Sequence, residues 1–365
     1  MQQLSMFAEH VYQTSPNTYK PLLINLKSIE EQKRFHEILK INPFVEVIDT
    51  IIKQITEFVK LKNPSQKLTE NQYIKEIDIY LNGNHSDFIG NWYYYPWNKK
   101  LVHILSEDDF VTVRTNRNQL KITPQEQSLL RSKTIGVIGL SVGQSVALTL
   151  VMERVCGIIK LADFDEIDLS NLNRLRTGVH NIGVKKTLIA AREIAEIDPY
   201  ISVEIFSDGI NDNNIDSFFK TLDLLVEVCD GLDMKIKSRL KARDLKIPVV
   251  MDTNDRGMID IERFDLEPNR PILHGLINEI DLTHLDNMQQ EQKLSLIMKI
   301  VAIENTSERL KQSMNEIGKT IISWPQLASS IMIGAGSCAD CCRRIFLNQH
   351  NNSGRYYIDT FLMIK

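Results

Sequence analysis

The sequence predicts an α/β fold built on a doubly wound, mostly parallel sheet. Three observations lead to this prediction. Short apolar runs alternate with helical periods between residues 113 and 275, a turn containing two glycines follows the first apolar run, and two aspartates follow the second. Alternating strands and helices are typical of βαβ units with parallel strands, in which the ligand crevice lies at the carboxyl ends of the strands.

The first βαβ unit is expected from residue 134 onward. Residues 134–138 are typical of a buried strand, residues 139–143 of a tight turn, and the sequence from Gln144 onward of an apolar helix. Residues 158–162 form the next expected strand, which ends in Asp163-Phe-Asp165. Strand, glycine turn, helix and strand in this order predict a Rossmann-like sheet.

Further elements follow the same alternation up to residue 275. They are a helix at 187–197, a strand at 203–206, a helix at 215–220, a strand at 222–229, a helix at 235–245, a strand at 247–251 and a half-buried strand at 258–264. The loop 252–257 between the last two strands either faces a substrate or is an ordinary solvated turn.

Two flanking regions complete the expected domain organisation. Residues 1–112 form a mixed, mainly helical region with helices at 29–39 and 45–61, a turn at 82–85 and a strand at 101–105. Its aromatic cluster at residues 92–97 is expected to pack a small core rather than to bind a ligand. Residues 276–365 form a helical segment, periodic at 285–310 and 326–347, that packs on the nucleotide-binding domain at 113–275.

Composition excludes several classes of protein. With 43% hydrophobic and 25% charged residues, the chain is expected to be globular and not disordered. A formal net charge of -4 gives no overall basic excess for nucleic acid, and no apolar run reaches the roughly 18 residues of a membrane helix. Five cysteines and no basic, apolar leader at the amino terminus predict reduced thiols and a cytoplasmic location.

The glycine turn and the acid after the second strand predict a nucleotide site. Gly139, Ser141 and Gly143 place free main-chain N–H groups at a helix start, where phosphate binds, although Ser141 and Gln144 depart from the pattern G-x-G-x-x-G. The Ser141 hydroxyl is a candidate phosphate donor. Asp163 stands where a carboxylate accepts hydrogen bonds from ribose, with Asp165 beside it.

Cationic and acidic residues further along favour a triphosphate over a dinucleotide. Asn171 and Arg174 follow the second strand, Lys186 begins a helix, and Asp230 follows the strand at 222–229, where it can hold Mg²⁺. A cleaving phosphate chain needs positive charge along it, whereas hydride transfer does not. Taken singly, the lysine and the loop acids are equally typical of solvated surface residues.

These residues together resemble the ThiF/MoeB adenylyltransferases, which share their fold with the ubiquitin-activating enzymes. The resemblance covers about residues 112–275. It rests on Asp163-Phe-Asp165, on residues 170–174 (Ser-Asn-Leu-Asn-Arg), on Gly183 to Lys186, and on Glu227-Val-Cys229-Asp230, where the family has Asp-Cys-x-Asp. The aromatic-rich amino-terminal region and residues 323–326 are similar to a bacterial branch whose ThiF-like domain is often joined to a nitroreductase-like domain.

The resemblance implies attack of a substrate carboxylate on the α-phosphorus of ATP, giving an acyl-adenylate and pyrophosphate. Mg²⁺ on Asp230 would then act with Arg174 and Lys186. The segment around Arg117 is similar to the one whose arginine reaches the ATP of the partner subunit, so the resemblance also implies a homodimer. Substrates in the family carry a carboxylate on a peptide, a ubiquitin-like protein or a modified tRNA base.

Cysteine positions limit the expected chemistry. Residues 252–337 contain no cysteine, and Cys338, Cys341 and Cys342 lie in an apolar helix, so transfer to a thioester is not expected. Two Cys-x-x-Cys pairs hold a structural zinc ion, and this chain has a single pair, so no zinc site is expected. An alternative function remains open, because Ser141, Gln144 and Glu227 also suit a non-catalytic nucleotide-binding sensor or scaffold.

Overall fold

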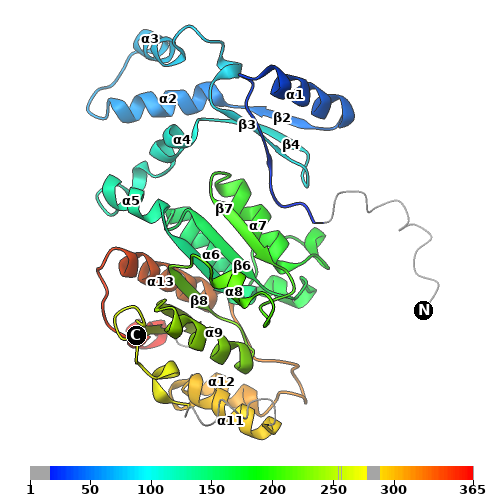
Figure 1. The fold of residues 1–365 in the computed structure, drawn as a ribbon, viewed down its shortest axis with the longest axis vertical. Helices are drawn as coiled ribbons and strands as arrows, with labels where there is room; N and C mark the ends of the chain where they lie inside the picture. The colour runs from blue at the N-terminus through cyan, green and yellow to red at the C-terminus, as the bar shows by residue number, and fades with distance from the viewer. Residues whose placement is uncertain (1–16, 254, 256, 278–287, 365) are drawn as a thin grey trace, which may run out of the picture. The chain divides into compact units, whose positions relative to one another are not determined.

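The computed structural model describes residues 17–253, 255, 257–277 and 288–364 of the chain (Figure 1). Two compact units are present, Met1–Pro124 and Gln125–Lys365. The expected helical segment at 276–365 belongs to the second unit. The finer division at residues 112 and 275 stays a prediction. In the described ranges, no helix combines the length and the apolarity needed to cross a membrane.

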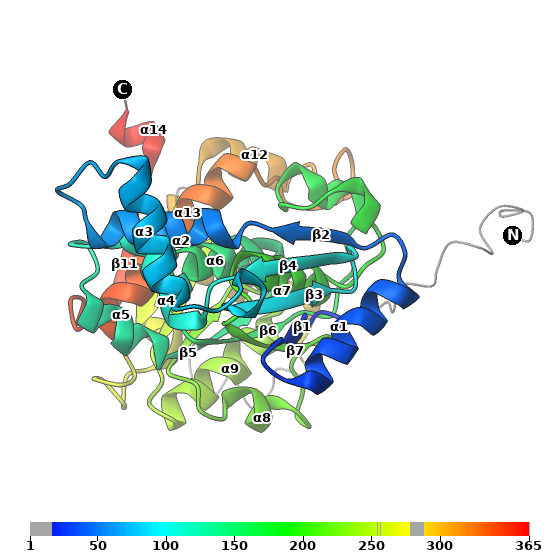
Figure 2. The ribbon, with the colours of Figure 1, turned by 90° about the horizontal axis from the view of Figure 1, so that it is seen from above.

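The first unit contains one small sheet and several helices. Its elements are β1 (Leu22–Ile24), α1 (Ile29–Ile41), β2 (Glu46–Asp49), α2 (Ile51–Lys62), α3 (Glu70–Leu81), η1 (Ser86–Phe88), β3 (Asn91–Tyr95), β4 (Lys100–Ile104), α4 (Glu107–Arg114) and η2 (Asn116–Asn118). Figure 2 shows the strands side by side in the order β1-β3-β4-β2, of which β2 and β4 are parallel.

Aromatic residues pack the core of this sheet, as the sequence predicts. Trp92 to Tyr95 are all buried in β3, and the Trp92 ring stacks on the His103 ring with centroids 4.1 Å apart. The helix expected at residues 45–61 is wrong in its first part. Residues 46–49 instead form strand β2, whose Val47 and Ile48 fit a strand as well as a helix.

The second unit begins within α5 (Pro124–Arg131) and contains the large sheet. Its further elements are β5 (Thr134–Ile138), α6 (Leu140–Glu153), β6 (Ile158–Ala162), η3 (Leu169–Asn173), η4 (Val179–Asn181), α7 (Lys186–Ile197), β7 (Ser202–Phe206), α8 (Ile215–Phe219), β8 (Leu224–Glu227), α9 (Leu232–Asp244), β9 (Val249–Thr253), β10 (Met258–Glu262), η5 (Ile272–Gly275), α11 (Gln290–Ile300), η7 (Ile303–Asn305), α12 (Glu308–Met314), α13 (Ala328–Phe346), β11 (Gly354–Tyr357) and α14 (Thr360–Met363).

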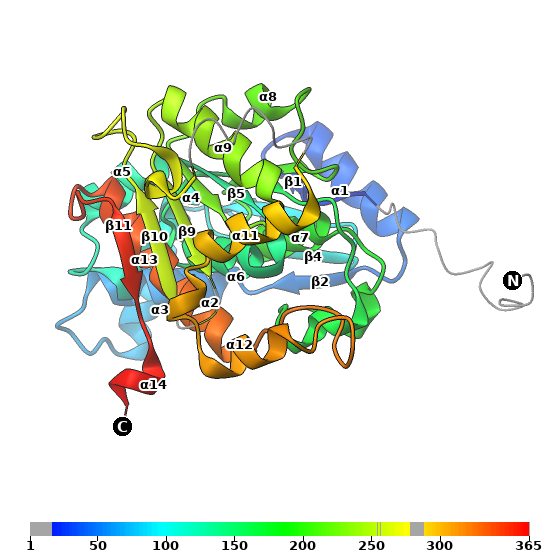
Figure 3. The same cartoon turned by 90° about the horizontal axis from the view of Figure 1, so that it is seen from below.

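The large sheet has the order β11-β10-β9-β8-β5-β6-β7. Strands β9, β8, β5, β6 and β7 are parallel, whereas β10 and β11 are antiparallel additions at one edge, visible beside β9 in Figure 3. The carboxyl ends of the five parallel strands therefore meet at one edge of the sheet. The predicted mostly parallel α/β fold is confirmed.

Helices cover both faces of the sheet. A Cβ built on Gly136 would touch Phe218 of α8, whereas Val137, the next residue of β5, faces Gly143 of α6. Neighbouring residues of a strand point to opposite faces, so α6 and α8 lie on opposite faces. Because α6 packs against α7 and α13, and α8 against α9, the sheet is doubly wound.

Further expectations about local structure are wrong in the second unit. The strand expected to be half buried at 258–264 is β10 at Met258–Glu262, and all of its residues are buried. The tight turn predicted at 139–143 is limited to Gly139, because α6 begins at Leu140. The loop predicted at 252–257 begins later, since β9 continues to Thr253 and Asp252 is only 4% exposed. Asn254 and Arg256 of that loop lie outside the described residues, as do residues 285–287 of the periodic stretch 285–310.

Candidate functional site

Gly139 connects β5 to α6 in a conformation that only glycine adopts readily. Its φ is +89°, and a Cβ at this position would lie 2.7 Å from the main-chain N and Cα of Cys229. The Gly139 N–H donates to Ala162 O of β6 at 2.9 Å. The turn therefore lies between the carboxyl ends of β6 and β8. As a result, α6 begins at the carboxyl edge of the sheet.

Gly143 lies one turn into α6 and not in the turn itself. A Cβ on Gly143 would lie 2.6 Å from Val137 Cγ1 and 3.1 Å from Val228 Cγ2. Gly143 thus allows α6 to approach the sheet closely. The third glycine of dinucleotide-binding turns has the same role. Its contact with a nucleotide stays a prediction.

Asp163 ties the tip of β6 to the start of α6. Its Oδ2 accepts the Leu140 N–H at 2.6 Å, and its Oδ1 accepts the Asp165 N–H at 2.8 Å. Burial raises the pKa of Asp163, while these two amides and Lys186 act in the opposite direction. Each carboxylate oxygen can accept a further hydrogen bond, so the predicted ribose contact is compatible with this geometry.

Lys186 forms an ion pair with Asp165 across the start of α7. The Lys186 Nζ donates to Asp165 Oδ2 at 2.7 Å, and its side chain is 7% exposed, whereas that of Asp165 is half exposed. The Lys186 N–H also donates to Asp165 O at 3.0 Å. The lysine is therefore held beside Asp163 and Asp165 by the sheet edge, and is not a free surface residue.

Asn171 stabilises the short helix η3 that carries the arginine. Its Oδ1 accepts the Asp168 N–H at 3.0 Å, while the Asp168 side chain accepts the Asn171 N–H, which makes a reciprocal cap. Asn171 is 7% exposed. The side chain thus fixes the loop between β6 and α7.

Arg174 reaches from this loop to the first turn of α6. Its Nη2 and Nε donate to Ser141 Oγ at 2.9 and 3.2 Å. Burial lowers the pKa of Arg174, and the negative charge of Asp230 opposes that change. Arg174, Ser141 and Asp230, predicted from three separate segments, are thus brought together at the carboxyl edge of the sheet.

Asp230 lies between β8 and α9 and is exposed. Cys229 is partly buried and lies outside β8, which ends at Glu227 and not at the expected residue 229. Burial, and then Glu227, raise the pKa of the Cys229 thiol, so it is protonated at neutral pH. All five cysteines are free thiols.

Glu227 at the end of β8, which the sequence marks only as a substitution, has a structural role beside the site. It is fully buried, accepts the Cys229 N–H at 2.9 Å and receives Lys235 Nζ on both oxygens at 3.0 and 3.2 Å. Burial would raise the pKa of Glu227, but Lys235 and Arg239 outweigh it and hold the pKa at about 2. Lys235 and Arg239 are four residues apart and therefore lie on the same face of α9. This spacing is the sequence signal that could have identified them as the partners of Glu227.

Gln144 is the second such residue, and it connects α6 to α7. Its Nε2 donates to Glu193 Oε2 at 2.7 Å and to Arg176 O at 3.3 Å. Burial raises the pKa of Glu193 to about 7, while Gln144 and Arg176 lower it. No local pattern in the sequence points from Gln144 to a partner 49 residues away.

Arg117 lies in η2 of the first unit and is exposed. Its predicted role toward a partner subunit stays a prediction. Across the described ranges, no group of three or more His, Cys, Asp or Glu side chains could hold a metal ion. Asp230 therefore offers a single carboxylate, which fits Mg²⁺ that takes its remaining ligands from water and phosphates.

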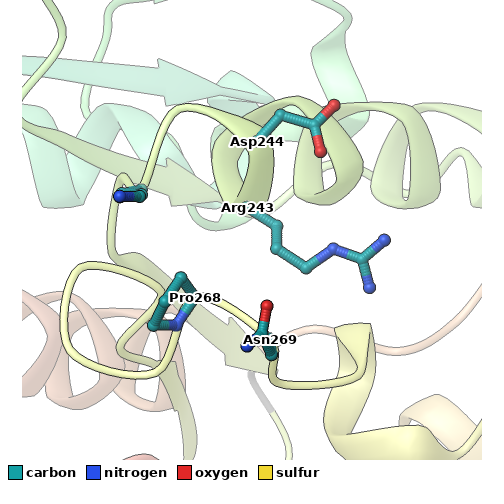
Figure 4. A pocket seen from close by; sticks show the side chains of 5 residues that line it. Arg243, Asp244, Pro268 and Asn269 are labelled. Atoms are coloured by element: carbon teal, nitrogen blue, oxygen red, sulfur yellow. The ribbon is translucent and has the colours of Figure 1, made fainter.

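A cavity of about 390 Å³ lies elsewhere in the second unit. Figure 4 shows its lining by Arg243, Asp244, Lys246, Pro268 and Asn269, from the end of α9 and the turn after β10. These elements meet at the amino end of β9, whereas the residues described above gather at the carboxyl ends of the strands. The cavity does not belong to the candidate site.

The site as a whole suits an anionic ligand. The first main-chain N–H groups of α6 and the Arg174 guanidinium supply positive charge, and Asp230 supplies one exposed acid beside them. This combination can neutralise a phosphate chain and place one divalent cation next to it.

Comparisons with known proteins show what the whole chain is similar to. The chain is 44% identical over 268 residues to the uncharacterized protein MT1398 of Mycobacterium tuberculosis (strain CDC 1551 / Oshkosh), covering 73% of this chain and only 38% of MT1398. It is 21% identical to the molybdopterin-synthase adenylyltransferase of Haemophilus influenzae (strain ATCC 51907 / DSM 11121 / KW20 / Rd) over 54% of this chain and 82% of that protein.

A solved structure of the E. coli tRNA N6-threonylcarbamoyladenosine dehydratase in complex with AMP is similar in fold, with a TM-score of 0.47 and 16% identity over 67% of this chain and 98% of that one. The model of the ThiF family matches residues 115–353, from the end of the first unit through β10 and α13. With more than half of its length matched, the chain belongs to the ThiF family.

Proposed function

We propose that this protein is an ATP-dependent adenylyltransferase that activates a substrate carboxylate as an acyl-adenylate and releases pyrophosphate. The observation that carries the proposal is the pair of hydrogen bonds from Arg174 to Ser141 at the start of α6, with the charge of Asp230 near enough to act on Arg174. A guanidinium beside a helix amino terminus is electrostatically unfavourable without an anion, so the arrangement favours a phosphate ligand.

In the proposed reaction, a carboxylate oxygen of the substrate attacks the α-phosphorus of ATP. A new oxygen–phosphorus bond forms, and the bond to the β-phosphate oxygen breaks, so the electron pair leaves with pyrophosphate. No general base is needed, because a carboxylate is already ionised at neutral pH. Arg174 and Lys186 offset charge on the phosphates, and Asp230 is proposed to hold Mg²⁺, which would neutralise the leaving group.

The substrate is proposed to carry its carboxylate on a peptide, a ubiquitin-like protein or a modified tRNA base. The chain spans 38% of the length of MT1398, so activities of the longer relatives extend here only as proposals. Transfer to a cysteine is not part of the proposal, because the Cys229 thiol near Asp230 is protonated at neutral pH. A homodimer in which Arg117 reaches the partner's ATP is a further part of the proposal.

The alternative, a non-catalytic nucleotide sensor, was suggested by Ser141, Gln144 and Glu227. Each of these side chains has a structural partner: Arg174, Glu193 and Lys235, respectively. None of the three contacts removes Asp230 or Arg174 from the sheet edge. The substitutions therefore give the sensor no specific support.

Two measurements test the proposal: binding of an ATP analogue and ATP–pyrophosphate exchange. Calorimetry with the α,β-methylene analogue of ATP and Mg²⁺ measures binding, and ATP–pyrophosphate exchange with peptides bearing a free carboxyl terminus measures adenylation. We expect binding by the wild type, and we expect Asp230→Ala to slow exchange by roughly 10²–10³-fold, the effect of losing one preorganised electrostatic group.

Asp244→Asn, at the opposite end of α9, is the matched control and should leave both measurements unchanged. Absence of analogue binding by the wild type contradicts the proposal and the sensor alike. Binding without exchange for any peptide, ubiquitin-like protein or tRNA offered supports the sensor.

A further inference from the structure

The guanidinium of Arg174 is held on two sides. On one side, Nη1 donates to Asn173 Oδ1 at 2.9 Å and to Ser170 O at 3.4 Å, both within its own loop. On the other side, Nε and Nη2 both donate to Ser141 Oγ. Within the described part of the chain, Ser141 thus provides the hydrogen bonds that connect Arg174 to another element, the first turn of α6.

Electrostatics alone does not keep a guanidinium at this place. The amino terminus of α6 carries partial positive charge, which repels Arg174, and burial of the guanidinium adds a desolvation cost. Asp230 supplies an opposing negative charge, but Asp230 is exposed and therefore screened by water. Asn173 and Ser170 fix the guanidinium within its own loop, and a directed acceptor on α6 is needed to fix it against the helix.

Glycine cannot supply that acceptor. The turn pattern G-x-G-x-x-G has glycine at the position of Ser141, where the main chain approaches a phosphate closely. Here the site combines a close main-chain turn at Gly139 with a hydroxyl one residue into the helix. The serine is therefore more than a tolerated replacement for glycine.

We propose that Ser141 is a positioning residue whose hydroxyl holds the Arg174 guanidinium over the first turn of α6 before a nucleotide binds, an inference that rests on the proposed function. The Nε–H and Nη2–H groups of Arg174 both donate to Ser141 Oγ, which acts as the acceptor. The proton of the Ser141 hydroxyl group therefore remains available to donate to a phosphate oxygen. A guanidinium that is already in place can stabilise the negative charge of the phosphate chain without first having to move.

The first measurement needs no nucleotide. In protein labelled with ¹⁵N-arginine, the Nε–H signal of Arg174 is assigned by its loss in Arg174→Lys. We expect slow exchange of this proton with water in the wild type and in Ser141→Thr, and fast exchange in Ser141→Ala. Ser145→Ala is the matched control, because Ser145 lies one turn further along α6 and its Oγ has no partner among the described residues.

The second measurement is the affinity for the α,β-methylene analogue of ATP with Mg²⁺, together with kcat/KM for exchange. Ser141→Ala and Ser141→Gly should each weaken affinity and kcat/KM about tenfold, as expected for a hydrogen bond to a charged group, while Ser141→Thr stays within about twofold. Thermal unfolding of Ser141→Ala and Ser141→Thr should change little, which separates positioning from a merely structural role, whereas Ser141→Gly also carries the cost of a glycine within a helix.

Three results overturn the inference: fast exchange of the Arg174 proton in the wild type, slow exchange that survives in Ser141→Ala, or Ser141→Gly binding the analogue as tightly as the wild type. If the proton behaves as expected but the wild type binds no analogue, the proposed function fails while the contact between Ser141 and Arg174 stands. The two failures are thereby distinguished.

Discussion

At the scale of single residues, glycines of this chain differ sharply in what they tolerate. Gly139 has a positive φ and no room for a Cβ against Cys229, whereas Gly336 lies within α13 with nothing within 4 Å of an added Cβ. The first glycine is required by the geometry of the turn, and the second only adds backbone freedom to a helix.

Opposite effects of alanine are therefore expected at these two positions. Gly139→Ala should lower the free energy of unfolding by at least about 1–3 kcal/mol, because the strained conformation and the clash add. Gly336→Ala should raise it by about 0.5–1 kcal/mol. Urea unfolding followed by circular dichroism measures both. Equal effects of the two substitutions would contradict the conformation assigned to Gly139.

The sequence predicts where the site residues lie better than it predicts which side chains they contact. Arg174 and Asp230 were expected at the same sheet edge because carboxyl ends of parallel strands converge. The contact between Arg174 and Ser141 was not foreseen, since it depends on where α6 begins. Likewise, the hydrogen bond from the Leu140 N–H to Asp163 Oδ2 follows from the turn at Gly139 and leaves no trace in the local sequence.

At the scale of secondary structure elements, charged side chains join α9 to the sheet. Glu227 of β8 pairs with Lys235 and Arg239, and Arg239 also donates to Glu262 Oε2 of β10 at 2.7 Å. The side chains of Glu227, Arg239 and Glu262 are fully buried. Removal of one partner from such a network leaves uncompensated charge in the interior.

Glu227→Gln should therefore lower the free energy of unfolding by about 3–5 kcal/mol, as does the loss of one member of a buried ion pair. Asp212→Asn, which removes the exposed partner of Lys237 on the same helix, should change it by less than about 1 kcal/mol. Both values come from urea unfolding at neutral pH. Similar small effects for the two variants would show that the buried network contributes little.

Asp252 gives a pH dependence to the packing of β9 against α13. Its carboxyl group lies against Gly334, has no hydrogen-bond partner among the described residues, and has a pKa raised by burial from 3.8 to about 7. Because the pKa is higher in the folded state than in the unfolded state, the associated stabilisation is fully present below about pH 4 and is lost as the pH rises through about 7.

Asp252→Asn removes this titration. Relative to the wild type, the variant should gain up to about 4 kcal/mol of unfolding free energy between pH 4 and pH 8, since each pKa unit corresponds to about 1.4 kcal/mol. Thermal or urea unfolding across this pH range provides the test, with the exposed Asp208→Asn as control. A difference between Asp252→Asn and wild type that does not vary with pH would refute the assignment.

Elements with strong local patterns were predicted closely, and those set by long-range contacts were not. Strands β5 and β6 agree with the predicted residues 134–138 and 158–162, because their apolar runs are bounded by turn residues. Strand β2 was assigned to a helix, and β11 was not predicted at all. Both are short edge strands of four residues, defined mainly by the strand beside them.

At the scale of the whole molecule, the candidate nucleotide residues belong to one unit, with one exception. Gly139, Asp163, Arg174 and Asp230 lie in the unit Gln125–Lys365, whereas Arg117 lies in the unit Met1–Pro124. Nucleotide binding and the proposed contribution of Arg117 can therefore be separated by cutting the chain between the units.

A fragment of residues 125–365 should bind the α,β-methylene analogue of ATP with an affinity within a few-fold of the full chain. Its exchange rate should fall by roughly 10²–10³-fold, as should that of full-length Arg117→Ala, if the arginine acts on the phosphates. Calorimetry and exchange on both proteins give the comparison. Full exchange activity in the fragment would remove Arg117 from the proposed mechanism.

Strand β11 has a consequence for biosynthesis. It pairs with β10, every residue of which is buried, yet it comes from a far later part of the chain, after α13. On the ribosome, β10 emerges well before its outer neighbour, so its edge of unpaired main-chain N–H and C=O groups is exposed to other nascent chains. Slow translation between the two strands would prolong that exposure, so recovery of native protein should depend on chaperones that shield nascent chains.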